Sequence, residues 1–358
     1  MLNQSYGSWE MIISDDHSTD RSLEVIHSFN DPRIKLITSR KNRGAHAAYT
    51  KAYNLCTGKY IISLDSDDYM APERIKKQVE FLEKSPDVGI LGTFIYQIDE
   101  VGNKVAKNEV YENWFNKNID LNDVRNWIWA NHLAHSSVVI RKDLHQKVGF
   151  FNPELLYSPD YEFWVRCLKY GAKIKVLKKK LTYCRSHSSN ITHKNPQEGF
   201  YETLFINIKY LKDLFEADKK IENDSLILTG IVNHEMYGKL PLEEKGKILQ
   251  IYLKDVEIES YKSFLTKVKN EKPAESFLSL VTILGDFRYH LDWHIRQLYL
   301  HKEANKQLKE QLVSHKENAG RPFYSKSYPR AKGFFDKIVS RLMDKPRVKK
   351  LKFKNEKN

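Results

Sequence analysis

The sequence lacks any segment that would carry the chain across or out through a membrane. Its longest apolar run, Val88–Tyr96, has nine residues and includes two glycines, whereas a membrane-spanning helix needs about 20 apolar residues. The chain does not open with the basic and then apolar segment of a secretory signal. We therefore expect a cytoplasmic protein that does not span a bilayer.

Cysteine is scarce. The 358 residues contain three cysteines, Cys56, Cys167 and Cys184. Because they are odd in number and far apart, they exclude a disulfide framework, and without a CxxC pair they offer no ordinary zinc site. We interpret them as reduced packing residues.

The composition does not indicate a disordered chain, and the positive charge is not spread evenly along it. The hydrophobic fraction of 41% and the charged fraction of 29% are those of a globular chain. The length predicts one catalytic-size unit and an appendage. The net charge of +13 is concentrated at the end, where residues 321–358 hold 13 Lys and Arg against 3 Asp and Glu. The body is therefore close to neutral, and the tail is a basic arm.

The first 65 residues alternate strand and helix patterns. Apolar runs at Trp9–Ser14, Ile34–Thr38 and Lys59–Leu64 are typical of buried strands. Helical patterns over Ser22–Phe29 and Ala45–Cys56 separate them. Repeated units of this kind predict an α/β fold with an open, mostly parallel sheet, whose ligands bind beyond the carboxyl ends of the strands. No strand pattern precedes Trp9, although such a sheet normally begins with a strand near its centre.

The later patterns divide into a mixed region and a helical region. Between residues 70 and 195 we expect two further strands, Val88–Ile98 and Ser136–Ile140, and two helices, Pro72–Lys84 and Tyr161–Tyr170. After Asn195 the strand patterns end, and helical patterns run through Phe200–Phe215, Glu243–Lys269 and Glu275–Asn318. We therefore divide the chain into an α/β domain over 1–195, a helical region over 196–320 and a basic tail over 321–358.

Carboxylates gather where two of the expected strands end. Asp65-Ser66-Asp67-Asp68 follows one strand, and a polar run that begins at Asp15-Asp16 follows another. Like charges so close together indicate a bound cation, and Mg²⁺ or Mn²⁺ suits carboxylate oxygens and diphosphates. Taken alone, each cluster is also readable as a solvated loop or a helix cap. Asn42-Arg43-Gly44 adds a turn before a helix, where a phosphate or ribose could bind.

Together these motifs resemble the nucleotide-sugar domain of family 2 glycosyltransferases, which have the GT-A fold. The resemblance rests on DDHSTD, then NRG, then a strand that ends in DSDD. Three later segments are also similar to that family: HSSVVIRKDLHQKVGFF, FNPELLYSPDYEFWVR and YCRSHSSNIT. The resemblance covers about residues 2–195, a little over half of the chain.

The resemblance implies a role for each carboxylate. Asp15 and Asp16 would contact the nucleotide base or ribose, and Asp65 would face the ribose. Asp67 would bind the divalent ion, Mn²⁺ or Mg²⁺, that bridges the diphosphate. Asp160 would be the general base that takes the proton of the acceptor hydroxyl. The mechanism of the family is a single inverting displacement at the anomeric carbon.

Two features depart from the family pattern. Pro159 stands where the family usually has Glu before the base, and Glu162 either compensates or is a first-turn helix charge. Asp160 itself could be a helix cap. The family's usual first strand is also missing ahead of residue 9. These departures keep open the alternative of a catalytically inactive scaffold protein with the same fold.

Three further polar residues are candidates on the basis of the resemblance. The resemblance implies that His135, Arg185 and His187 lie near the diphosphate or the acceptor; alternatively, they are polar residues of solvated loops. Trp127 and Trp129 could stack on sugar rings, whereas the helical position of Trp164 favours a place in the core.

The basic tail has its own pattern. Ala331–Met343 places apolar residues on one helical face, and further lysines and arginines follow to Lys357. This is typical of an anchor on an anionic membrane; a solvated tail is the alternative. We do not expect nucleic-acid binding, because no recognition motif accompanies the charge.

The sequence thus predicts a metal-dependent inverting glycosyltransferase on the cytoplasmic face of a membrane. It would move a sugar from a nucleotide donor, in the first place a UDP-sugar, to a glycan or lipid-linked acceptor. Family members of this kind build bacterial surface polysaccharides, and the composition, rich in Lys, Asn and Ile, fits a bacterial source.

Overall fold

A computed structural model describes residues 1–105, 109–188, 190, 194–217, 225–282 and 284. All of them belong to one compact unit, residues 1–291. The basic tail 321–358 and the helical pattern beyond residue 284 lie outside the described residues. None of the helices in the described part is long and apolar enough to cross a bilayer.

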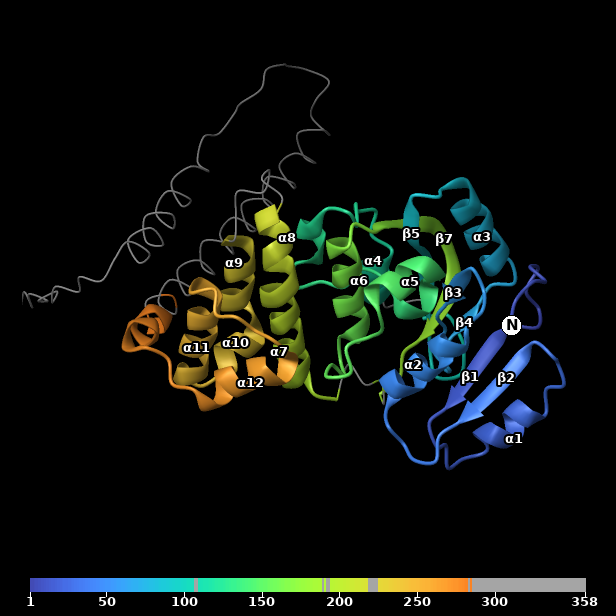
Figure 1. The fold of residues 1–358 in the computed structure, drawn as a ribbon, viewed down its shortest axis with the longest axis horizontal. Coiled ribbons are helices and arrows are strands. Elements are labelled where there is room, and N and C mark those ends of the chain that lie inside the picture. The colour runs from blue at the N-terminus through green and yellow to red at the C-terminus, as the bar shows by residue number, and fades with distance from the viewer. Residues whose placement is uncertain (106–108, 189, 191–193, 218–224, 283, 285–358) are drawn as a thin grey trace, which may run out of the picture. The chain divides into compact units, whose positions relative to one another are not determined.

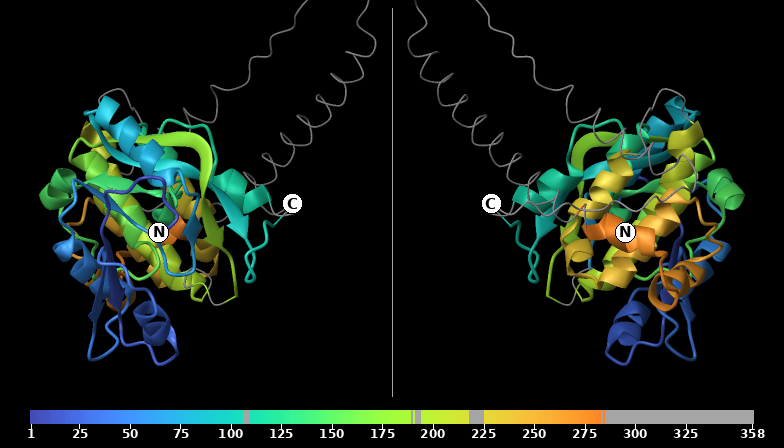
Figure 2. Two further views of the ribbon diagram at one scale, coloured as in Figure 1. Left: turned by 90° about the vertical axis from the view of Figure 1, so that its right-hand side faces the viewer. Right: turned by 90° about the vertical axis from the view of Figure 1, so that its left-hand side faces the viewer.

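A five-stranded sheet lies at the centre of this unit (Figures 1 and 2). Its order is β3-β6-β5-β7-β4, where β3 is Tyr60–Ile62, β4 Tyr69–Met70, β5 Val88–Ile98, β6 Val139–Arg141 and β7 Lys173–Arg185. The middle strand β5 is an almost continuous apolar run and is buried along most of its length. It therefore reads as a strand covered on both faces.

This sheet is mixed rather than mostly parallel, which corrects the sequence prediction. β5 and β7 are parallel, whereas β6 runs antiparallel to both β3 and β5, and β4 runs antiparallel to β7. The prediction treated each apolar run as part of a strand–helix–strand unit. Short β4 and lysine-rich β7 carry no clear apolar alternation, so their pairing could not be read from the chain.

A separate sheet of two parallel strands comes first in the chain. β1 (Met11–Asp15) pairs with β2 (Ile34–Thr38) and, within the described strands, with no other. Two helices accompany them, α1 (Ser22–His27) and α2 (Ala45–Leu55). As predicted, no strand precedes β1 in the described part of the chain. A cavity of about 1630 Å³ is lined by residues of both β1 and β3, so it lies between the two sheets.

Four helices pack around the central sheet. They are α3 (Arg74–Lys84), α4 (Glu109–Phe115), α5 (Lys142–Val148) and α6 (Pro159–Lys169). Two short 3₁₀ helices, Val124–Trp127 and His135–Ser137, connect them. α6 is the most deeply placed of the four, with Phe163 and Trp164 fully buried. Trp164 is thus a core residue, as its position in the helix predicted.

The described residues after Asn195 are helical. The elements are α7 (Pro196–Ile206), a π-helical turn (Asn207–Leu211), α8 (Lys212–Ala217), α9 (Ser225–Asn233), α10 (Glu235–Lys239), α11 (Leu242–Leu253) and α12 (Tyr261–Asn270). The single helix predicted over Glu243–Lys269 is two, α11 and α12. Between them, Asp255 has a φ of 50°, which no helix interior accommodates.

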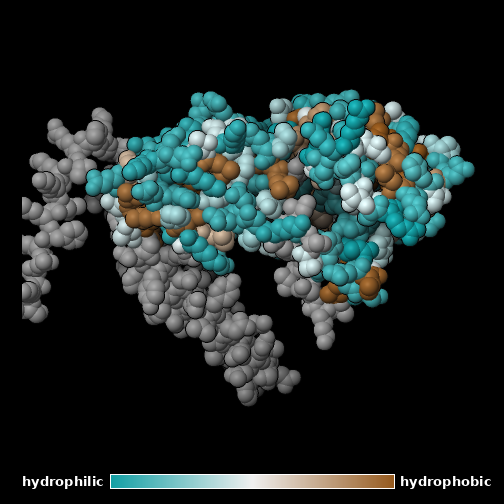
Figure 3. Space-filling model, turned by 90° about the horizontal axis from the view of Figure 1, so that it is seen from below, coloured by the Kyte–Doolittle hydropathy of each residue, from teal (hydrophilic) through white to brown (hydrophobic). Residues whose placement is uncertain are grey.

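One hydrophobic core joins the sheet to these helices. Ile90 of β5, Trp164 of α6, Phe205 of α7 and Phe264 of α12 are all fully buried members of the same cluster. The α/β fold with a helical C-terminal region is therefore confirmed. On the face drawn in Figure 3, hydrophobic residues form small patches between larger hydrophilic areas.

Candidate active site

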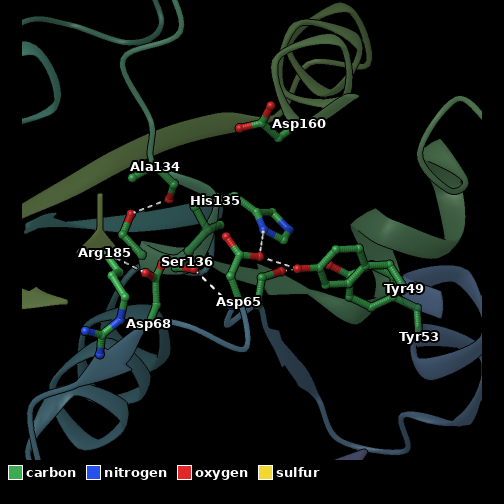
Figure 4. Close-up of polar contacts among 12 residues, drawn as sticks. Tyr49, Tyr53, Asp65, Asp68, Ala134, His135, Ser136, Asp160 and Arg185 are labelled. Carbon is green, nitrogen blue, oxygen red and sulfur yellow. Dashed lines mark hydrogen bonds and ion pairs between the residues drawn. The ribbon is translucent and has the colours of Figure 1, made fainter. Parts of the chain in front are cut away.

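An acidic loop connects β3 to β4 and carries the predicted metal and ribose ligands. Asp65, Asp67 and Asp68 lie within one turn, which the bond from the Asp68 N–H to the Asp65 carbonyl closes. The polar residues around it come from four separate segments: α2, the 3₁₀ helix at His135, the end of β7 and the start of α6 (Figure 4).

Asp65 is held by three neighbours. Its Oδ1 accepts hydrogen bonds from the Tyr49 hydroxyl and from His135 Nδ1, the latter at 3.0 Å. Its backbone N–H donates to Ser136 Oγ at 2.9 Å. Burial alone would raise the pKa of Asp65, but His135, Tyr49 and Ser136 outweigh it and lower the pKa to about 2. Asp65 is therefore a fixed negative charge at any physiological pH.

Asp68 has the opposite electrostatic character. Burial, together with the charges of Asp65 and Asp67, raises its pKa to about 6. Its Oδ1 accepts the backbone N–H of Arg185 at 2.7 Å, which ties the acidic loop to the end of β7. Like charges so close together raise the cost of ionisation, and an added cation would relieve that cost.

Asp67 and His187 form a pair at the open side of the loop. His187 Nε2 lies 3.0 Å from Asp67 Oδ2, and the two side chains are 22% and 37% exposed. No group of three or more His, Cys, Asp or Glu in the described residues is arranged as a metal site. The Asp67 carboxylate nevertheless fits Mg²⁺ or Mn²⁺, because such ions prefer oxygen ligands, keep several waters and take further ligands from phosphates.

Arg185 binds backbone carbonyls of the acidic loop and of the segment that follows β5. Its guanidinium donates to the carbonyls of Asp67, Asp99 and Glu100 at 2.8, 2.8 and 2.7 Å. It therefore shapes the acidic loop. Its Nε and Nη1 are engaged in these bonds, and the contact of Arg185 with a diphosphate or an acceptor stays a prediction.

Asp15 and Asp16 organise the first sheet's loops. Asp15 is buried and accepts the N–H groups of His17 and Ser18. Asp16 Oδ2 accepts the N–H groups of Arg43 and Gly44 at 2.7 and 2.6 Å. Gly44 has a φ of +88°, a conformation that favours glycine. The other oxygen of Asp16, Oδ1, is buried and has no hydrogen-bond partner in the described structure, so it is free for a ligand.

Asp160 lies in the first turn of α6. Its Oδ2 accepts a hydrogen bond from Asn131 Nδ2 at 2.8 Å, and its Oδ1 accepts the N–H of Tyr161. Burial raises the pKa of Asp160, although the charge of His135 opposes the shift. A carboxylate with a raised pKa takes a proton more readily, which is the property of a general base. Pro159 fits beside it because proline is favoured at the first position of a helix.

Glu162 does not share the site of Asp160. It is fully buried and makes two bonds to Arg166, at 2.7 and 3.0 Å. Arg166 in turn donates to the carbonyls of Val148 and Phe150. This pair links α6 to the end of α5, so Glu162 is engaged in the scaffold, and of its two predicted roles the structure favours the helix charge.

His135 lies between the two carboxylates that matter most. Its Nδ1 bonds to Asp65, and the charges of both Asp65 and Asp160 act on it. Burial lowers the pKa of His135, but these carboxylates outweigh it, and the net shift is upward. Its Nε2 is buried without a hydrogen-bond partner in the described structure. Figure 4 shows Asp160 apart from the bonded group around Asp65.

The tryptophans proposed for sugar stacking belong to the packing. Trp127 is fully buried, and its indole N–H donates to the Leu121 carbonyl. Trp129 stacks on Phe200 of α7 at 5.8 Å between ring centroids. Sugar stacking on either ring is therefore not supported by its surroundings.

The sequence did not single out three residues that complete the site: Tyr49, Asn131 and Ser136. Tyr49 lies about one helical turn after the Asn42-Arg43-Gly44 turn. Its position near that motif is the one local feature of the sequence that could have identified it. Asn131 donates to the carboxylate of Asp160, 29 residues away along the chain, and Ser136 Oγ accepts the backbone N–H of Asp65, 71 residues away. Only the fold brings such partners together.

Comparison with known proteins gives one family. Residues 1–149 match the model of the family described as Glycosyl transferase family 2. The match includes every carboxylate of the acidic loop and of the first sheet, and it ends before Asp160.

Two curated relatives illustrate the range of similarity. MJ1057 of Methanocaldococcus jannaschii, named an uncharacterized glycosyltransferase, is 31% identical over 172 residues, which are 47% of this chain and 56% of the relative. The chain thus spans about half the length of that protein. WfaP of Escherichia coli is 27% identical over 191 residues, 53% of this chain and 71% of the relative. Its name is UDP-Glc:alpha-D-GlcNAc-diphosphoundecaprenol beta-1,3-glucosyltransferase.

A solved structure agrees with the fold. The crystal structure of S. aureus TarS 1-349 in complex with UDP superimposes with a TM-score of 0.52 at 20% identity. The alignment covers 71% of this chain and 74% of that chain. At this identity the likeness shows the fold alone.

Proposed function

We propose, from the premise that the chain belongs to glycosyltransferase family 2 through residues 1–149, that it transfers a sugar from a nucleotide donor to a glycan or lipid-linked acceptor. The observation that carries this proposal is the acidic loop at the end of β3. It presents Asp65 and Asp67 on one side of His135, and Asp160, partly buried at the start of α6, lies on the other side. The arrangement offers one site for a diphosphate and one for a hydroxyl.

The donor side is built from fixed polar groups. Asp16 has a free buried oxygen and holds the Arg43-Gly44 turn, and Asp65 is permanently ionised. Such groups suit the hydroxyls and ring N–H of a nucleoside, because carboxylates only accept hydrogen bonds. We take UDP as the nucleotide, the donor named for WfaP.

Asp67, with His187 beside it, would hold Mn²⁺ or Mg²⁺ at this site. The ion would neutralise the negative charge that develops on the departing diphosphate. The exposure of both side chains leaves room for phosphate oxygens and water as further ligands.

Asp160 would act on the acceptor. As the acceptor oxygen forms its bond to the anomeric carbon, the bond from that carbon to the diphosphate oxygen breaks. The hydroxyl proton passes to Asp160, and the nucleoside diphosphate leaves with the bonding electron pair. A single displacement of this kind inverts the anomeric configuration. Asn131 keeps one carboxylate oxygen in place, and the raised pKa favours the proton transfer.

The proposed acceptor is based on the name of a relative, and the proposed location in the cell on the basic tail. WfaP acts, by its name, on a sugar linked to diphosphoundecaprenol, so we propose a lipid-linked or glycan acceptor of bacterial surface polysaccharide synthesis. Residues 321–358, which would anchor the chain on the inner face of the membrane, lie outside the described residues.

Calorimetric titration of UDP with and without Mn²⁺ tests the donor site. We expect binding that requires Mn²⁺ and is lost in Asp67→Ala. Asp87→Ala is a matched control, because Asp87 is 58% exposed and pairs with Lys173 away from the acidic loop. Binding by Asp67→Ala equal to that of the parent would overturn the metal assignment. A folded parent without any Mn²⁺-dependent UDP binding would favour the inactive scaffold or another donor nucleotide.

A further inference from the structure

We infer that Glu202, on helix α7, is the positioning residue for Asp160. The inference rests on the proposed function, since it assumes that Asp160 is the base. Glu202 lies in the helical region, 42 residues beyond Asp160 in the numbering. No motif discussed above includes it.

The geometry of Glu202 is that of a buried anion site. Its Oε1 accepts the N–H of Leu156 at 2.6 Å, and its Oε2 accepts those of Tyr157 and Ser158 at 2.8 and 2.6 Å. The residue is 2% exposed. Burial raises the pKa of Glu202, and the three N–H groups oppose that shift. An isolated buried carboxylate would be costly, so these donors make its position possible.

The bonded segment leads directly into the proposed base. Ser158 is the N-cap of α6, and its side chain makes no capping hydrogen bond. Glu202 binds the N-cap backbone from outside, and Asp160 follows two residues later. Because Asp160 is in the first turn, the direction of its carboxylate depends on where that turn begins. Glu202 therefore fixes the start of α6, and with it the base.

A second contact from the same helical segment holds the partner of Asp160. Asn207, in the π-helical turn after α7, accepts the N–H of Trp129 at 3.3 Å and donates to the Tyr161 hydroxyl at 3.3 Å. Trp129 lies two residues before Asn131, whose amide bonds to Asp160. α7 and the π-helical turn thus hold both sides of the Asp160–Asn131 bond.

Glu198 provides a matched control on the same helix. It bonds to the Tyr261 hydroxyl and to Lys269, on the side of α12. Its side chain is 32% exposed. Glu198→Gln and Glu202→Gln are thus the same change one helical turn apart, and only the second removes a carboxylate from the α6 start.

The test measures Asp160 directly and needs no acceptor. Carboxyl-¹³C aspartate is incorporated into the full chain, and the Asp160 signal is assigned by its absence in Asp160→Asn. We expect Glu202→Gln to shift the titration midpoint of Asp160. The NH₂ group of glutamine cannot accept a hydrogen bond from the backbone N–H groups that Glu202 binds, so the segment before α6 should be displaced. Glu198→Gln should leave the midpoint unchanged. An unchanged midpoint in folded Glu202→Gln overturns the inference.

A kinetic readout separates positioning from stability. With the donor that the parent turns over, Glu202→Gln should lower kcat about 10- to 100-fold, as small misplacements of a catalytic group do. The KM for donor and the affinity for UDP should not change. A lower unfolding temperature with unaltered kcat would mean a purely structural role. Full transfer by Asp160→Asn would instead refute the proposed base, whatever Glu202 does.

If Glu202→Gln does not fold, Glu202→Asp replaces it. This variant keeps the carboxylate but shortens its reach to the N–H groups of Leu156, Tyr157 and Ser158, so it should shift the same Asp160 signal. A folded Glu202→Asp with a parent-like Asp160 titration would also overturn the inference.

Discussion

The two sheets of this molecule end in carboxylates of the same kind but are covered very differently. Within β1 and β2, Asp15 is the one buried residue, and α1 buries none. In β5, by contrast, nearly every residue is buried: Ile90 packs in the cluster that includes Trp164 of α6, and Leu91 packs in a second cluster with Leu82 of α3. Val25 and Phe29 beside the first sheet are 52% and 51% exposed.

This difference shows how the two halves of the site are held. The proposed donor half depends on hydrogen bonds from Asp15 and Asp16 to loop N–H groups. The proposed acceptor half depends on a packed core and on the buried Glu202. Buried apolar area is the main stabilising term in folding, at about 25 cal/mol per Å². The acceptor half should therefore be the more rigid of the two.

The largest expected effect is on the rigid half. Asp160→Asn keeps the size of the side chain and removes the base, so transfer should fall about 10²- to 10⁴-fold. UDP affinity should not change, because the donor half is untouched. Initial rates and calorimetry on the same preparation measure both. A variant with parent-like rates would show that the base lies elsewhere.

The pH dependence should report the same carboxylate. Asp160 must be ionised to accept a proton, and burial raises its pKa above the ordinary value of 3.8. Transfer should consequently fall about tenfold per pH unit below that raised pKa. It should be lost at a higher pH than an exposed aspartate would give. A profile of kcat/KM that is level down to pH 4 would contradict this.

A smaller effect is expected on the donor half. Asp16→Ala removes the acceptor for the Arg43 and Gly44 N–H groups, each a hydrogen bond to a charged group. UDP affinity should fall about tenfold, the lower end for such bonds at an exposed site. Asp20→Ala on the same loop, where Asp20 caps Ser22 alone, is the control. Equal affinities in the two variants would remove Asp16 from the donor site.

The smallest effect tests the packing of the helical region. A Cβ on Gly230 would overlap the indole ring of Trp129, whereas one on Gly199 would meet nothing closer than 3.8 Å. Gly230→Ala should lower the free energy of unfolding by about 1–3 kcal/mol. Gly199→Ala, inside α7, should raise it by about 0.5–1 kcal/mol. Urea denaturation measures both, and a neutral Gly230→Ala would mean that Trp129 moves easily.

The sequence predicted the parts of the fold that local pattern controls. The strands Ile34–Thr38 and Val88–Ile98 have the bounds expected from their apolar runs, and the helix around Asp160 is present. The lysine-rich strand β7 was not predicted, because its sequence does not alternate between apolar and polar residues. It is a strand because it pairs with β5 and β4. The break at Asp255 depends on one backbone angle, which periodicity does not reveal.

The same distinction holds for the site. Acidic residues at strand ends could be identified because their spacing is local. Arg185 and Glu162 were placed near the chemistry by resemblance, but the structure ties them to carbonyls and to Arg166. No local sequence pattern identifies Glu202, since its role depends on three N–H groups about 45 residues away in the chain.

Hydrogen exchange of the full chain, with and without UDP and Mn²⁺, tests the contrast between the two halves most directly. In the free protein, amides of β1 and β2 should exchange much faster than those of β5 and β7, because few buried contacts protect them. With UDP and Mn²⁺, protection should rise in residues 11–16, 42–45 and 65–68, while α7 stays unchanged. Slow exchange of β1 in the free chain, or ligand protection confined to the helical region, would contradict this account.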